Sequence, residues 1–114
     1  MTEQINQTQY EFYQIAETAE LPSGERLFIE LDGKPVVVFN LAGHYYAIDD
    51  VCTHDDGPVG EGEVSGFTIT CPRHGARFDL RNGKALALPA VVDVNAYPVR
   101  EKDGWIEIGV PAET

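Results

Sequence analysis

Glycine and proline divide this chain into short segments, and that spacing restricts the folds open to it. Eleven glycines and seven prolines occur among 114 residues, and turn signals recur about every eight to twelve residues, as in small β-sandwiches and barrels. The segments between the turns are rich in Val, Ile, Phe and Tyr, which favour extended strands. No stretch has a convincing helical period, so the pattern predicts an all-β fold.

The pattern predicts eight strands. They are Glu11–Ala16, Glu25–Leu31, Pro35–Leu41, His44–Asp49, Phe67–Thr70, Ala76–Asp79, Val94–Arg100 and Trp105–Ile108. Between them, Asp32-Gly33 is typical of a hairpin turn and Asn82-Gly83 of another tight turn. Residues of these types tolerate the positive φ angles that such turns require.

The length and charge of the chain limit its organisation and its partners. A chain of 114 residues has room for one compact core, so we expect a single domain over residues 1–114. Nineteen acidic and eight basic side chains give a formal net charge of −11. Such a charge repels nucleic acid and anionic membranes and favours partners with a basic face. Solubility alone is the alternative role for this charge.

The N-terminus has neither the basic segment nor the apolar segment of a signal peptide. The longest aliphatic run elsewhere covers only residues 36–39, so we expect no membrane span and a cytoplasmic location. A reducing cytosol does not sustain structural disulfides. The two cysteines are therefore expected to be thiolates that bind metal.

The stretch from Val51 to Phe78 differs in composition from the rest of the chain. It contains both cysteines, two of the three histidines, five glycines and two prolines. Glycine lets the backbone approach a bulky group closely, and proline limits the entropy that a loop loses on ordering. This composition predicts loops that hold a bound group.

Two mixed pairs of potential metal ligands lie in this stretch. The first pair is Cys52 and His54, the second is Cys71 and His74, and sixteen residues separate His54 from Cys71. Each pair offers one soft thiolate and one neutral imidazole. Four such ligands suit either tetrahedral zinc or a diiron cluster with two ligands per iron. A zinc finger of the Cys2His2 type groups its histidines on a helix, and no helix follows these pairs.

The order C-x-H, sixteen residues, C-x2-H resembles the Rieske family. CTHDDGPVGEG is similar to its first cluster-binding loop and CPRHGARFDLRNGKAL to its second. The resemblance implies a Rieske-type antiparallel β-sandwich with two cluster-binding loops at one end and one 2Fe-2S cluster. It also implies that Cys52 and Cys71 hold the inner iron and that His54 and His74 hold the outer one. A zinc-stabilised interaction domain is the non-redox alternative.

Departures from the family pattern indicate which branch the chain resembles. In the high-potential branch, each cluster loop has an additional cysteine and a disulfide joins the two, whereas Arg73 occupies one such place here. That branch also has a serine and a tyrosine that donate hydrogen bonds to sulfur, where this chain has Ala76 and Phe78. Without these donors the reduced cluster is less stabilised, so we expect a low reduction potential.

Residues outside the predicted ligand set have other interpretations. Arg73 and Arg77 could neutralise the reduced cluster or contact a partner, and Pro89 could belong to a third loop over the cluster or to a simple turn. His44 lies far from both loops in the sequence. We expect it to be an ordinary half-buried histidine that binds no metal.

The resemblance and the chain length together predict a function. We expect the chain to end before the mononuclear-iron domain of a ring-hydroxylating oxygenase could begin. The predicted protein is a low-potential Rieske ferredoxin, an electron carrier and not itself an enzyme. It would carry single electrons from a flavin-containing reductase to a terminal non-haem iron oxygenase. The alternative is the small Rieske-like subunit of an NAD(P)H-dependent assimilatory nitrite reductase.

Overall fold

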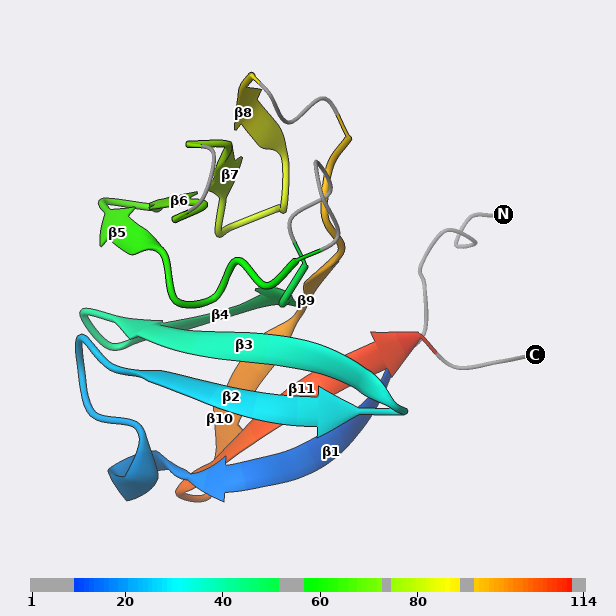
Figure 1. Cartoon of the computed structure of the whole chain (residues 1–114). Coiled ribbons are helices and arrows are strands. Elements are labelled where there is room, and N and C mark those ends of the chain that lie inside the picture. Colours follow the sequence, from blue (N-terminus) through cyan, green and yellow to red (C-terminus); the bar gives the residue numbers. More distant parts are fainter. Residues whose placement is uncertain (1–9, 52–56, 73–74, 89–91, 112–114) are drawn as a thin grey trace, which may run out of the picture.

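Antiparallel strands form nearly all of the fold in the computed structural model, which describes residues 10–51, 57–72, 75–88 and 92–111. The strands form three sheets (Figure 1). Sheet one has the order β1 (Tyr10–Glu17), β11 (Trp105–Pro111), β10 (Val99–Lys102). Sheet two has the order β2 (Arg26–Leu31), β3 (Lys34–Leu41), β4 (His44–Asp49), β9 (Ala96–Tyr97). Sheet three has the order β5 (Glu63–Ser65), β6 (Thr68–Thr70), β7 (Arg77–Asp79), β8 (Ala85–Ala87).

Sheet two is the middle layer of the molecule, with sheets one and three on its opposite faces (Figure 1). Strand β3 can have a sheet on each side because its side chains point alternately into two cores. Val38 belongs to the core that contains Ile106 of sheet one, whereas Val37 belongs to the core that contains Phe78 of sheet three. A continuous run of valines thus fits a strand that is buried on both faces.

The structure contains seven of the eight predicted strands, with some changed boundaries. Strand β4 has the bounds predicted from the sequence, and β11 continues to Pro111. The predicted strand Val94–Arg100 was wrong as a single element, because it is divided into β9 and β10 at Pro98. Proline has no backbone N–H to donate to a sheet, so it interrupts the ladder.

Two short strands and one turn of helix were not predicted. Strands β5 and β8 have three residues each, and η2 is a 3₁₀ turn over Thr18–Glu20. The predicted hairpin turn is confirmed, since Asp32 and Gly33 both have positive φ, 56° and 78°. Within the part of the chain that the structure describes, no helix is long and apolar enough to cross a membrane.

Candidate metal centre

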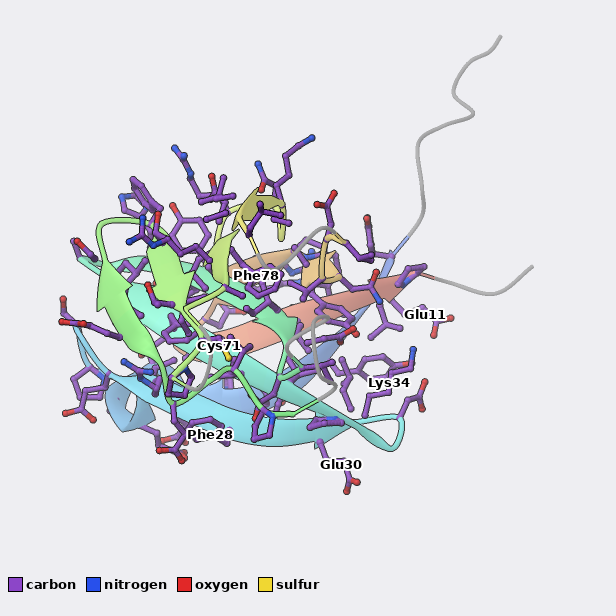
Figure 2. The ribbon with its side chains drawn as sticks, turned by 45° about the horizontal axis from the view of Figure 1, so that its top comes forward. Glu11, Phe28, Glu30, Lys34, Cys71 and Phe78 are labelled. Carbon is purple, nitrogen blue, oxygen red and sulfur yellow. The ribbon has the colours of Figure 1, made fainter. Side chains whose placement is uncertain are left out.

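Cys71 is the predicted ligand that the structure describes. It follows β6 directly, is 1% exposed and belongs to the same core as Ala76 and Phe78. Figure 2 shows Cys71 and Phe78 in the interior of the molecule. The predicted ligands Cys52, His54 and His74 lie outside the described residues.

The loop that begins at Cys71 is closed by its own backbone. The Cys71 N–H donates to the Ala76 carbonyl oxygen at 2.7 Å, and the Gly75 N–H donates to the Cys71 carbonyl oxygen at 3.1 Å. Gly75 has a φ of +79°, which glycine adopts without strain. These bonds hold the backbone of Cys71 at the base of a tight turn between β6 and β7.

The first loop returns towards this turn through residues 57–62. Val59 is fully buried in the core that contains Cys71. A Cβ added at Gly62 would collide with the carbonyl oxygen of Thr70, the residue before Cys71. The structure therefore brings the described limb of the first loop against the start of the second, as a shared site requires.

Arg26 and Asp50 hold this limb, and no pattern in the sequence indicated either residue. The N–H groups of Val59 and Gly60 donate to Asp50 Oδ1 at 2.9 and 2.6 Å. Arg26 Nη1 donates to the carbonyl oxygens of Gly60 and Gly62 at 2.6 and 2.8 Å. Neither residue belongs to a ligand motif, so these contacts between distant segments had no signal in the sequence.

Asp49 joins the start of the first loop to strand β9. Its carboxylate accepts hydrogen bonds from the Tyr97 hydroxyl at 2.5 Å and from Asn95 Nδ2 at 2.9 Å. Burial, together with the hydrogen bond to Asp49, raises the pKa of Tyr97 well above its ordinary value. Tyr97 therefore stays protonated at neutral pH and remains a hydrogen-bond donor to Asp49.

The other residues discussed from the sequence occupy distinct places. Ala76 and Phe78 are buried in the same core as Cys71. Neither side chain has a hydroxyl group, so neither can donate a hydrogen bond within this core. Arg77 lies between them on β7, is exposed and therefore faces away from that core. His44 is exposed at the start of β4, so the expectation that it is half-buried was wrong. Pro89 lies outside the described residues.

The described residues fit a 2Fe-2S cluster. A cluster of this kind needs soft sulfur ligands in a site that excludes water, and Cys71 supplies a sulfur within an apolar core. Gly75, four residues after Cys71, has open space around its Cβ position. A Rieske centre needs two thiolates and two imidazoles, and of the predicted ligands the structure describes Cys71.

Comparisons with known proteins identify a family that binds a 2Fe-2S cluster. The family described as Rieske [2Fe-2S] domain matches residues 11–98. The 3-phenylpropionate/cinnamic acid dioxygenase ferredoxin subunit of Shigella flexneri serotype 5b (strain 8401) is 42% identical over 95 residues, which are 82% of this chain and 88% of that protein.

Two solved structures share the fold. The ferredoxin of carbazole 1,9a-dioxygenase from Nocardioides aromaticivorans IC177 has a TM-score of 0.80 and 31% identity, over 85% of this chain and 95% of its own. A chain in a complex of reduced oxygenase and oxidized ferredoxin of carbazole 1,9a-dioxygenase has a TM-score of 0.80 and 24% identity, over 90% of this chain and 96% of its own. The family match and the 42% identical relative place the present chain in the Rieske 2Fe-2S domain family.

Proposed function

We propose that this chain is a low-potential Rieske ferredoxin of a multicomponent oxygenase system. It carries single electrons from a flavin-containing reductase to a terminal non-haem iron oxygenase of the ring-hydroxylating type. The observation that carries this proposal is the 42% identity to a dioxygenase ferredoxin subunit. The match extends over 88% of the length of that subunit. Relatives of this kind are electron carriers and not the catalytic components, so the nitrite reductase alternative is not favoured.

The proposed ligands are Cys52, His54, Cys71 and His74. A 2Fe-2S cluster bound by them supplies reversible one-electron transfer. Cys52 and Cys71 would hold the inner iron, and His54 and His74 would hold the outer one. The buried position of Cys71 supports its place on the inner side.

The apolar groups around Cys71 support a low potential. Val59, Ala76 and Phe78 are fully buried and share its core. They exclude water, and their side chains donate no hydrogen bond to sulfur. Added negative charge is poorly stabilised in such surroundings, so the chain should give up an electron readily.

We also propose a single Rieske domain over residues 1–114 and a cytoplasmic location. The family match over residues 11–98 and the middle sheet shared by both cores support one domain. The charge of −11 supports partners with basic docking faces.

Electron transfer with purified components tests the function. The holoprotein is mixed with a flavin-containing reductase, NADH and the oxidised terminal oxygenase of a ring-hydroxylating system. We expect reduction of the oxygenase to depend on the ferredoxin and to fail with the apoprotein. A holoprotein that accepts electrons from the reductase and passes none to any such oxygenase would contradict the proposal.

A further inference from the structure

We infer that Arg26 and Asp50 are positioning residues that hold residues 59–62, which follow the first ligand pair, in place and thereby control retention of the cluster. The inference rests on the proposed ligand set, because Cys52 and His54 precede these residues closely in the sequence. It concerns the isolated ferredoxin and is independent of the identity of its redox partners.

Asp50 joins the beginning of the loop to its returning limb. Its own N–H donates to the Pro35 carbonyl oxygen at 2.9 Å, so its backbone is held at the end of sheet two. Its Oδ1 accepts two backbone N–H groups, from Val59 at 2.9 Å and from Gly60 at 2.6 Å. Hydrogen bonds to an ionised acceptor are stronger than neutral ones. The residue two positions before Cys52 therefore holds Val59 and Gly60 at the end of sheet two.

Arg26 holds the same limb from a neighbouring strand. Its Nη1 donates to the carbonyl oxygens of Gly60 and Gly62 at 2.6 and 2.8 Å. Its guanidinium carbon lies 5.0 Å from the centre of the Phe39 ring, a cation–π contact that orients the group. Asp50 thus accepts from the N–H of Gly60 while Arg26 donates to its carbonyl oxygen.

The limb is also closely packed at Gly60 and Gly62. A Cβ added at Gly60 would lie 2.7 Å from Phe28 Cε1 and 2.9 Å from Asp50 Oδ1. On the other side, a Cβ at Gly62 would collide with the Thr70 carbonyl oxygen. The limb therefore packs against Phe28 of sheet two at Gly60, and against Thr70, the residue before Cys71, at Gly62. A loosened limb would disturb both cluster loops.

Asp50 accepts hydrogen bonds from the limb and Arg26 donates hydrogen bonds to it, so each role can be removed by its own substitution. Asp50→Ala removes the acceptor, whereas Asp50→Asn removes the charge and keeps an oxygen that can accept both N–H groups. Arg26→Met removes the donor and keeps an apolar stem. Glu30→Gln is the matched control, since Glu30 is exposed on β2 and its side chain has no hydrogen bond or ion pair within the described ranges. Figure 2 shows its side chain pointing away from the ribbon.

The experiment measures the rate at which the oxidised holoprotein loses its visible absorbance in the presence of an iron chelator. Asp50→Ala and Arg26→Met should each release the cluster about tenfold faster or more, because each loses strong hydrogen bonds to the loop. Asp50→Asn should recover to within about threefold of the wild type, and Glu30→Gln should match it. The reduced Asp50→Ala protein should also show shifted g values in its EPR spectrum, which a loss of overall stability alone would not produce.

Release rates and g values in Asp50→Ala and Arg26→Met equal to those of Glu30→Gln would overturn the inference. If Asp50→Ala does not accumulate as folded protein, Arg26→Met alone decides between the two results. A wild-type chain that takes up no 2Fe-2S cluster would overturn the proposed ligand set together with this inference, and that failure is distinct because it appears before any substitution.

Discussion

Ala76 and Phe78 determine which groups surround the sulfur of Cys71. Both side chains are buried in the core of this cysteine, and neither has a hydroxyl group. Reduction of the cluster adds negative charge that is shared with the sulfurs. A donor aimed at sulfur stabilises the reduced state more than the oxidised one, so these two residues are expected to keep the potential low.

Restoring hydroxyl groups should therefore raise the midpoint potential. A hydrogen bond contributes about 0.5 to 1.5 kcal/mol, which corresponds to roughly 20 to 65 mV for one electron. We expect rises up to this size in Ala76→Ser and in Phe78→Tyr, measured by redox titration of the holoprotein. Phe67→Tyr is the control, because Phe67 is exposed and its ring lies against Tyr46. An unchanged or lower potential in both buried variants would refute this role of the two side chains.

The ion pair of Arg81 and Asp79 makes part of the stability of the fold depend on pH. Arg81 donates to Asp79 through Nε at 3.1 Å and Nη2 at 2.9 Å, and these hydrogen bonds hold the pKa of Asp79 below its ordinary value of 3.8. The folded state therefore favours the ionised carboxylate. Its contribution to stability is complete above the ordinary pKa and is lost as the pH falls through the lowered one.

Asp79→Asn should remove this part of the acid sensitivity. Asparagine cannot ionise, so the melting temperature of the variant should fall less than that of the wild type between about pH 6 and pH 2.5. Asp103→Asn, at an exposed turn position with φ of 54°, should keep the wild-type dependence because asparagine tolerates this conformation. Parallel curves for Asp79→Asn and the wild type would show that the carboxylate contributes nothing.

At the scale of elements, long strands with β-branched runs were predictable and short strands were not. Strands β3 and β4 carry enough Val, Ile and Tyr to be recognised. Strands β5 and β8, Glu-Val-Ser and Ala-Leu-Ala, carry little strand preference and form because neighbouring strands pair with them.

The ligands could be predicted from the sequence, whereas the residues that hold the ligand loops could not. The four proposed ligands were recognisable because they form a local motif with a defined spacing. The clamp of Arg26 and Asp50 joins residues that are 34 and 10 positions from Gly60 in the sequence. No local pattern encodes such contacts, since they depend on how the strands pack.

The loop after β7 offers a test of close packing between elements. Gly83 has a φ of +79°, and a Cβ there would collide with the Val94 carbonyl oxygen. Gly66 has a φ of +61° and no atom within 4 Å of its Cβ position. Gly66→Ala should cost about 1 kcal/mol of unfolding free energy from backbone strain alone. Gly83→Ala should cost at least about 2 kcal/mol, because collision adds to strain. Equal losses in urea denaturation would contradict the packing explanation.

At the scale of the whole molecule, sheet two separates the core that contains Cys71 from the second core. Sheets one and three pack on opposite faces of sheet two (Figure 1). Cys71 directly follows β6 of sheet three and belongs to the core between sheets two and three. The net charge of −11 acts over the whole surface and can steer a basic partner before contact. A carrier that must bind and leave needs a small interface, which makes long-range attraction important for its encounter rate.

The rate of reduction by the reductase should therefore depend on salt. As ionic strength rises from about 0.01 M to about 0.15 M, the screening length falls from about 30 Å to about 8 Å. We expect the second-order rate constant, measured by stopped flow, to fall over this range. A rate constant that does not change with salt would mean that the charge serves solubility alone.

The central claim is that two histidines and two cysteines of this chain bind a 2Fe-2S cluster. The most direct measurement is the EPR spectrum of the dithionite-reduced protein, recorded for the wild type, His54→Ala and His44→Ala. We predict a rhombic Rieske signal in the wild type and in His44→Ala, because His44 is exposed on β4. We predict its loss in His54→Ala, since imidazole ligation of one iron distinguishes a Rieske centre from a cluster with four cysteines. A wild-type signal that persists unchanged in His54→Ala would contradict the account.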